Sequence, residues 1–234
     1  MKVIIFPILI ASALITAIIN RTDTVQKTKI LSDNSRLTYN LNEKNKLDGA
    51  YFVENTERNV WLRGTYKEEK RTGNWYAFNS DKTVFIRYNY DLKKLLYIDT
   101  VTIKKAEITI LDKNDDVAKG ASPLLPICSI DQYVSLLGEA AKAGYPKDNI
   151  IYNKPTLVTI TAIVKSAKDV KYSVIYNFRG TNYTFDINNK DLDFPIDWIP
   201  STYSGKDVEA EFKVSTNLVF DPNPSQTRRF KWNY

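Results

Sequence analysis

Trp61-Leu62-Arg63-Gly64-Thr65-Tyr66, followed after a short charged run by Gly73-Asn74-Trp75-Tyr76, is the stretch that decides the fold of this chain. In both parts a glycine stands two residues before an aromatic residue. Side chains alternate in character along the first part, which is typical of a β-strand with two different faces. A glycine at such a position lets an aromatic ring lie over the neighbouring backbone, because no Cβ is in the way. The stretch therefore predicts a β-hairpin held together by aromatic rings.

The same pattern continues on both sides of this hairpin. Gly49-Ala50-Tyr51 lies 15 residues before the first motif (64 − 49), Gly73 lies 9 residues after Gly64 (73 − 64), and alternating rings recur in Arg87-Tyr88-Asn89-Tyr90. Five strands separated by turn-forming stretches are predicted over residues 50–53, 60–67, 74–79, 84–90 and 95–101. Single hairpins of this size cannot bury their own apolar face. We therefore expect consecutive hairpins to stack on one another in one antiparallel meander.

These Gly-x-Tyr and Gly-x-Trp units resemble the MORN-type repeats of bacterial antitoxin-like proteins over residues 47–90. The positions that match are Gly64, Tyr66, Gly73, Trp75 and Tyr76, with Gly49 and Tyr51 matching in part and Tyr88 and Tyr90 only as aromatic residues. The resemblance implies a single-layer β-meander that serves as a scaffold or a binding module.

The second half of the chain predicts an antiparallel sheet covered by one helix. Ser129 and Gln132 form a capping-box pattern, and an apolar stripe at helical spacing follows up to the stop at Gly144 and Pro146; its members are Ile130, Tyr133, Val134, Leu137 and Ala141. Alternating segments predict about five strands near residues 158–164, 172–178, 183–187, 208–214 and 230–234. The expected fold class is mainly β (α+β), with this sheet and its packed helix following the meander.

The expected domain organisation has five parts: a signal peptide or anchor over residues 1–20, a polar linker over 21–40, the MORN-like domain over 41–111, a linker over 112–128 and the α+β domain over 129–234. Lys2 followed by the apolar run of residues 3–19 is the pattern of an export signal. The run is also close to the length of a membrane-spanning anchor, so cleavage and retention both stay open. Either way, we expect an exported protein of the periplasm, cell envelope or extracellular space, and membrane contact only through this segment.

Composition excludes several classes of site. The 234 residues include no histidine, which removes Ser-His-Asp and Cys-His catalysis and histidine-ligated metals. Cys128 is the single cysteine and stands in the apolar segment 124–128, which indicates a buried thiol rather than a nucleophile. The net charge of +6 is spread among 27 acidic residues, which indicates a mixed surface and no nucleic-acid partner. No cofactor and no metal site is predicted, because Asp112, Asp115 and Asp116 lack the order of a calcium loop.

The candidate binding residues are the rings of the predicted meander: Trp61, Tyr66, Trp75, Tyr76 and Tyr88. Two interpretations stay open for them. They are either packing residues of a thin sheet or an exposed surface for a glycan, lipid or protein partner. The expected function is a non-enzymatic cell-envelope scaffold that binds an envelope protein or a glycan, with no catalytic residue.

Two alternatives rest on other residues. A glycan-active hydrolase would need two neighbouring carboxylates, for which the candidates are Glu68/Glu69, Asp115/Asp116 and Asp191/Asp193. A partner of a TonB-type transport system is suggested because Ile196-Asp197-Trp198-Ile199-Pro200 and Gly205-Lys206-Asp207-Val208 resemble the end of a TonB C-terminal domain. The additional strand that ends at Tyr234 departs from that pattern.

Overall fold

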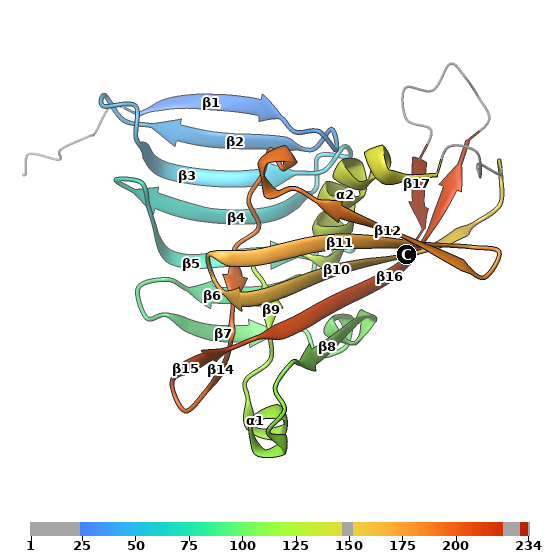
Figure 1. Cartoon of the computed structure of the whole chain (residues 1–234). Coiled ribbons are helices and arrows are strands. Elements are labelled where there is room, and N and C mark those ends of the chain that lie inside the picture. Colours follow the sequence, from blue (N-terminus) through green and yellow to red (C-terminus); the bar gives the residue numbers. More distant parts are fainter. Residues whose placement is uncertain (1–23, 147–151, 222–229, 234) are drawn as a thin grey trace, which may run out of the picture.

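Two large antiparallel β-sheets with a helix between them form most of the computed structural model, which describes residues 24–146, 152–221 and, for the backbone, 230–233 (Figure 1). The mainly β fold with a meander, a second sheet and one packed helix is confirmed. The predicted signal peptide or anchor over residues 1–20 lies outside the described residues. No helix within the described ranges combines the length and the apolar character that a membrane span requires.

The first sheet is a seven-stranded meander in which every strand pairs with the next one along the chain. Its strands are β1 (Val25–Ile30), β2 (Arg36–Leu41), β3 (Leu47–Glu54), β4 (Val60–Lys67), β5 (Lys70–Phe78), β6 (Val84–Asn89) and β7 (Lys94–Ile98). The polar linker expected over residues 21–40 is wrong, since β1 and β2 occupy it. All six side chains of β1 are exposed, so this edge strand lacks the apolar alternation by which strands are recognised in a sequence.

The turns at one end of this sheet repeat with a period of 24 residues. In each turn the first residue donates its backbone N–H to the carbonyl of the fifth, and the fourth residue has a positive φ. These turns begin at Leu31, Asn55 and Asn79, spaced 24 residues apart (55 − 31 and 79 − 55). Gly49 and Gly73 also have positive φ and share this spacing. The glycine spacings of 15 and 9 residues are therefore two parts of one 24-residue repeat.

Gly64 has a different role from these two glycines, because it makes room for a ring. A Cβ on Gly64 would lie 2.1 Å from Cδ2 of Trp75, so the indole of β5 rests directly on the backbone of β4. The β4–β5 register is interrupted at this point, between the pairs Arg63–Tyr76 and Thr65–Thr72. Trp75 is fully buried as a result. Of the three glycines in the Gly-x-aromatic motifs only Gly64 makes room for a ring, since a Cβ on Gly73 would meet nothing within 4 Å and one on Gly49 would meet Asn40.

The second sheet is built around one long strand, β16 (Ala210–Phe220), with β10 (Thr156–Ser166) along one edge. On that side, β11 (Asp169–Phe178) and β12 (Thr181–Ile187) complete the sheet. The other edge of β16 is shared by two short strands, β8 (Ala106–Ile110) at its beginning and β17 (Phe230–Asn233) at its end. Residues 106–110 therefore belong to the second sheet, although the sequence places them in the first domain.

The segments between the sheets are ordered rather than open linkers. The expected linker over residues 112–128 contains α1 (Asp115–Gly120) and β9 (Leu125–Pro126), which pairs with β13 (Trp198–Ile199). A hairpin around Gly205, formed by β14 (Ser201–Tyr203) and β15 (Lys206–Val208), leads into β16. Short 3-10 helices complete the connections: η1 (Thr102–Lys105), η2 (Lys142–Gly144) and η4 (Asn189–Asp191). Cys128 is buried, and burial raises the pKa of its thiol.

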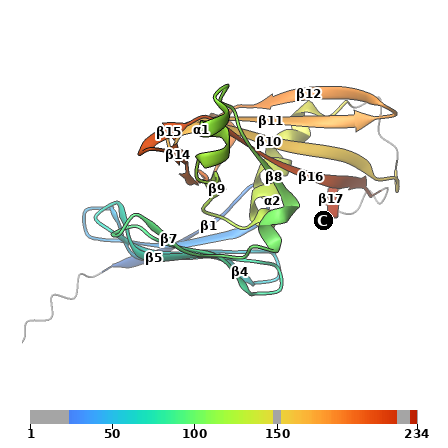
Figure 2. The same ribbon diagram turned by 90° about the horizontal axis from the view of Figure 1, so that it is seen from below.

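Helix α2 (Ile130–Ala141) lies between the two sheets (Figure 2). Ser129 caps it, since its Oγ accepts a hydrogen bond of 3.1 Å from the backbone N–H of Gln132. The sequence predicts one apolar stripe, but nearly every side chain of the helix is buried, including Leu136 on the other side. Tyr133 packs edge-on against Trp198 and Phe212 of the second domain. The helix therefore forms part of the core shared by both sheets.

Replacing Gly64 with Ala should destabilise the protein by about 1–3 kcal/mol, because the new methyl group has no room beneath the indole of Trp75. The free energy of unfolding in urea measures this effect. In a Trp75→Leu background the same Gly64→Ala change should cost much less, since the smaller side chain leaves space. Equal costs in the two backgrounds would contradict the assigned contact.

Candidate functional site

The two faces of the seven-stranded sheet separate the five candidate binding residues. Tyr66, Trp75 and Tyr88 point to the side that faces the second domain, while Tyr76 points to the opposite, outer side. Trp61 is the extra residue of a β-bulge, because Leu62 pairs with Val53 and Val60 pairs with Glu54. The structure therefore brings three of the five rings together and places Tyr76 and Trp61 elsewhere.

The inward-facing rings form a cluster with two further tyrosines. Trp75 lies at its centre, with ring centroids 5.5 Å from Tyr51, 5.3 Å from Tyr66 and 5.6 Å from Tyr90. Tyr88 extends the cluster, 5.0 Å from Tyr90 in an edge-on arrangement. Burial raises the pKa of the Tyr51, Tyr66, Tyr88 and Tyr90 hydroxyls, which therefore stay protonated. The rings of this cluster therefore pack against one another and against the core.

A guanidinium group lies within this cluster and ties it to the second domain. The guanidinium carbon Cζ of Arg71, on β5, lies 4.1 Å from the ring centre of Trp75, and the Arg71 side chain is only 9% exposed. Its Nε lies 2.9 Å from the carboxylate of Asp197 and 3.0 Å from the Tyr66 hydroxyl, to which it donates. Tyr90 accepts from Arg71 Nη1 and donates to Asp197 at 2.8 Å. Burial lowers the pKa of Arg71, but the charge of Asp197 and the two tyrosine hydroxyls raise it by more, so the pKa lies above its ordinary value.

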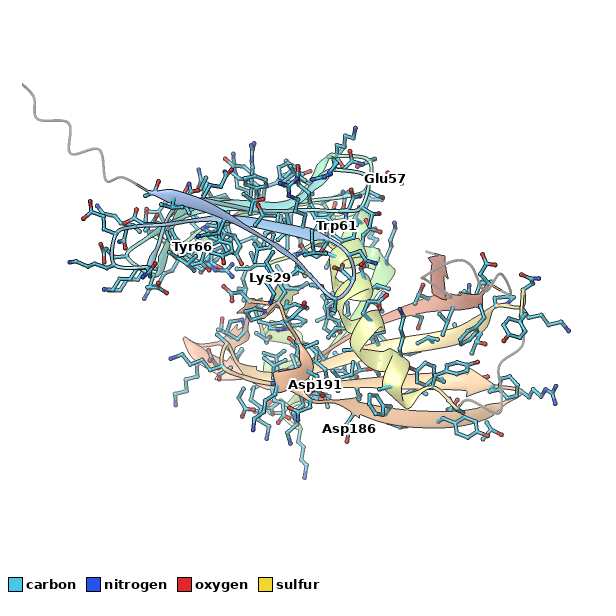
Figure 3. All side chains as sticks on the ribbon, turned by 90° about the horizontal axis from the view of Figure 1, so that it is seen from above. Lys29, Glu57, Trp61, Tyr66, Asp186 and Asp191 are labelled. Carbon is cyan, nitrogen blue, oxygen red and sulfur yellow. The ribbon has the colours of Figure 1, made fainter. Side chains whose placement is uncertain are left out.

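Other contacts between the halves of the molecule lie beside this cluster. The backbone N–H of Ser32, in the β1–β2 turn, donates to the Asp193 carboxylate at 2.7 Å. Lys29 of β1 donates to the Asp193 carbonyl at 3.2 Å, and Figure 3 shows Lys29 facing the segment that carries Asp191. At the other end, Ser80 N–H donates to the Asp131 carboxylate at the start of α2. The inner face of the first sheet therefore forms the contact surface between the two domains.

The outer face of the same sheet carries a row in which rings and arginines alternate. The pairs Phe52–Arg63, Arg63–Tyr76, Tyr76–Arg87 and Arg87–Tyr97 stand opposite one another on neighbouring strands from β3 to β7. Opposite residues of antiparallel strands share a face, so all five side chains point outward. Tyr97 is 48% exposed, and the other rings are half-buried. We call these five residues the outer row.

Shallow hollows lie on both sides of Tyr76 within the outer row. One, of about 390 Å³, is lined by Phe52, Arg63 and Tyr76 among others, and the next, of about 300 Å³, by Tyr76, Arg87 and Tyr97 together with Val84. The Arg63 guanidinium stacks 4.9 Å from the ring centre of Tyr76. Among the described residues no carboxylate forms an ion pair with Arg63 or Arg87, and the buried Nε of Arg87 has no acceptor. This face combines apolar area with cationic donors that have no anionic partner.

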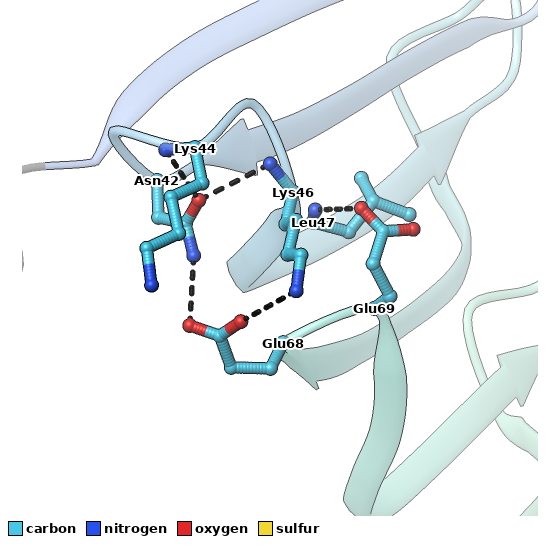
Figure 4. Close-up of polar contacts among 6 residues, drawn as sticks. All are labelled: Asn42, Lys44, Lys46, Leu47, Glu68 and Glu69. Atoms are coloured by element: carbon cyan, nitrogen blue, oxygen red, sulfur yellow. Dashed lines mark hydrogen bonds and ion pairs between the residues drawn. The ribbon is translucent and has the colours of Figure 1, made fainter.

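The carboxylate pair Glu68/Glu69 forms the two-residue turn between β4 and β5, where both residues have positive φ. Figure 4 shows that Glu68 accepts from Asn42 at 3.0 Å and pairs with Lys46 at 3.3 Å. Glu69 accepts from the backbone N–H of Leu47 at 2.7 Å (Figure 4). Each carboxylate therefore bonds to the neighbouring β2–β3 hairpin and holds the two turns together.

The other two carboxylate pairs also have local partners. Asp115 and Asp116 begin α1, where Asp115 forms an exposed ion pair with Lys119. Asp191 lies in η4, whereas the neighbouring Asp193 makes the contacts to Ser32 described above. Within the described ranges, no cluster of three or more histidine, cysteine, aspartate or glutamate side chains has the arrangement of a metal site.

Comparisons with protein-family models, with curated proteins and with solved structures give no match for this chain. The meander is thus established by the strand pairing alone, and the resemblances to MORN repeats and to TonB are carried by the sequence motifs.

Sequence reasoning missed the residues that pair with the rings. Arg71 belongs to the charged run between the two glycine motifs, and its partner Asp197 lies 126 positions further on, so nothing local connects them. The outer row was missed because its members stand one on each strand. Arg63 and Arg87 are 24 residues apart, as are Phe52 and Tyr76, so the 24-residue repeat is the signal that could have revealed it.

Replacing Arg71 with Met should destabilise the protein by about 3 kcal/mol, because Asp197 and two tyrosine hydroxyls lose their partner. The expected loss of stability lies at the lower end of the range for a buried ion pair, because the Asp197 side chain is 36% exposed. Urea unfolding measures it. Arg58→Met is the matched control: Arg58 lies in the turn between β3 and β4, is 62% exposed and pairs with Glu54, and should cost under about 0.5 kcal/mol. Equal losses in both variants would contradict the role of Arg71.

Proposed function

We propose that this protein is an exported, non-enzymatic scaffold of the cell envelope that binds its partner through the outer row of the seven-stranded sheet. The observation that supports this most is the alternation of rings with arginines that have no ion-pair partner among the described residues, on a face that the second domain leaves open. Patches in which apolar area and cationic donors stand together are typical of interaction surfaces.

The contrast between the two faces supports this assignment. Rings on the inner face pack around Trp75 and Arg71 and are needed for the fold. Among the described residues the rings of the outer row have no second layer above them and Arg87 has no carboxylate partner, so folding gives no comparable reason for Tyr97 to be aromatic or for Arg87 to be charged. Arginine and tyrosine are enriched among residues that dominate binding energy, because each offers a large contact area together with directed hydrogen bonds.

The non-enzymatic part of the proposal is supported by the chemistry of the carboxylates. A glycosidase needs one free acid and one free base about 5–10 Å apart. Glu68 and Glu69 instead accept hydrogen bonds from the β2–β3 hairpin. The thiol of Cys128 is buried with a raised pKa, which is the opposite of a reactive cysteine.

The location in the envelope is proposed from the N-terminal sequence. A lysine followed by the apolar run of residues 3–19 is the feature of the chain that supports export. In that compartment the partner classes are an envelope protein or a glycan. Fractionation of cells that express the intact chain should place it with the envelope or the medium, and recovery in the cytosol alone would contradict export.

A sedimentation experiment tests the proposed surface. The soluble protein without residues 1–20 is mixed with insoluble cell-envelope material of the host and centrifuged. The wild-type protein should pellet with the material, and the Tyr76→Ala/Tyr97→Ala variant should pellet about tenfold less, because it loses two rings of the outer row.

The matched control is Tyr152→Ala/Tyr183→Ala, which removes two exposed tyrosines from the second domain. This variant should pellet like the wild type. Melting temperatures of all three proteins should agree within a few degrees. Binding that is unaffected by the loss of Tyr76 and Tyr97, or equally reduced in both variants, would overturn the proposed surface.

A further inference from the structure

We infer that the outer row binds a linear anionic polysaccharide that lies across the strands and bears an acid group on alternate sugars. The inference rests on the proposed function and adds the chemical class of the ligand. Three properties of the row lead to it: the spacing of its rings, the spacing and freedom of its arginines, and its direction relative to the strands.

The rings of the outer row recur on every second strand, Phe52 on β3, Tyr76 on β5 and Tyr97 on β7. Neighbouring strands are about 4.8 Å apart, so consecutive rings lie roughly 9.6 Å apart and the whole row spans roughly 19 Å. Two consecutive sugars of an extended, β-linked pyranose chain cover nearly the distance between rings. The apolar C–H face of every second sugar can then pack on a ring, as amphipathic aromatic side chains favour.

The arginines stand between the rings with the same spacing. Arg63 lies between Phe52 and Tyr76, and Arg87 lies between Tyr76 and Tyr97. An acid group on alternate sugars would therefore meet one guanidinium per repeat. A guanidinium binds a carboxylate or sulfate through two parallel hydrogen bonds. Because Arg63 already stacks on Tyr76, part of the ordering that binding requires exists before the ligand arrives.

The charge of this face is complementary to such a ligand. Among the described residues no ion pair engages Arg36, Arg63 or Arg87, which all lie on the outer face. Glu54, opposite Arg36, pairs with Arg58 at 3.8 Å. Three guanidinium groups without an ion-pair partner among the described residues favour a polyanion over a neutral chain, because each can form charge-assisted hydrogen bonds with an acid group.

An extended peptide fits the row less well. It advances about 3.3 Å per residue, so the distance between two rings corresponds to three residues, and side chains three apart point to opposite sides of an extended chain. Peptides that pair with sheets also add along an edge strand, where backbone groups are free, rather than across a face. The row runs perpendicular to the strands, from β3 to β7, which is the direction of a long flexible chain laid over the sheet.

Titration calorimetry with defined oligomers tests the inference. The probe is a hyaluronan octasaccharide, which carries one carboxylate on every second sugar, and the comparison ligands are cellohexaose, oligo(dT) of ten nucleotides and a decamer of glutamate. The folded protein, residues 21–234, should bind the octasaccharide at least about tenfold more tightly than any comparison ligand. The affinity should fall with added salt, since ion pairs contribute to it.

Variants locate the binding. Arg63→Gln/Arg87→Gln should weaken octasaccharide binding about tenfold or more, and Tyr76→Leu about tenfold, at unchanged melting temperature. The control is Arg179→Gln, because Arg179 stacks on Phe178 at 5.2 Å in the second domain and repeats the ring–arginine contact outside the row. This control should bind within about twofold of the wild type.

Three results would overturn the inference: no octasaccharide binding by the wild type, equal or tighter binding of any of the three comparison ligands, or a loss in Arg63→Gln/Arg87→Gln that is no larger than in the Arg179→Gln control. The sedimentation experiment then separates the two proposals. If pelleting still depends on Tyr76 and Tyr97, the surface is correct and the ligand class is wrong. If pelleting does not depend on them, the proposed function fails as well.

Discussion

The contact between the indole ring of Trp75 and the bare backbone of Gly64 is the constraint on which the rest of the structure depends. It brings β5 close to β4 and fixes the ring in the centre of the inner face. Arg71 then stacks on that ring and forms an ion pair with Asp197, the residue directly before β13. The backbone carbonyl of Asp197 in turn accepts a hydrogen bond from the N–H of Ile127, the residue directly after β9. The close packing within one hairpin therefore positions the residues that connect the two sheets.

The alternation of a β-strand gives the seven-stranded sheet two separate tasks. Trp75 and Tyr76 are neighbours in the sequence but point to opposite sides. Inner rings pack around Trp75 and Arg71, and Tyr90 bonds to Asp197 of the second domain, so they stabilise the molecule. In the described part of the chain, no second layer lies above the outer rings, and the arginines that alternate with them have no carboxylate partner. The same 24-residue repeat therefore produces both a packed inner face and an outer face on which rings and arginines alternate.

Much of the fold could be predicted because its signals are local. The glycine–aromatic spacing predicts the meander, and the Ser129 cap with its apolar stripe predicts α2. The failures have physical causes. The side chains of the edge strand β1 are all exposed, so its sequence has the polar composition of a linker. Strand β8 joins the second sheet because β16 is long enough to pair with it as well as with β17. The burial of α2 on nearly all sides could not be predicted from the helix alone, because it depends on the layers that pack against the helix from other parts of the chain.

The candidate site was predicted only in part, since a sequence shows which residues are aromatic but not which of them share a face. The bulge at Trp61 shifts the alternation of β4, so Val60 and Leu62 point to opposite faces although they are two residues apart. Ion pairs such as Arg71–Asp197 join distant segments and leave no local trace. The outer row becomes visible only when the strands are aligned in register.

Hydroxyl-radical footprinting of the folded protein, read residue by residue with mass spectrometry, tests the division between the two faces most directly. The account predicts strong modification of Tyr97, intermediate modification of Tyr76 and Phe52, and protection of Trp75 and Tyr51, in the order of their exposure. Modification of Trp75 or Tyr51 as rapid as that of Tyr97 would contradict it, because the inner rings would then not form the core between the sheets.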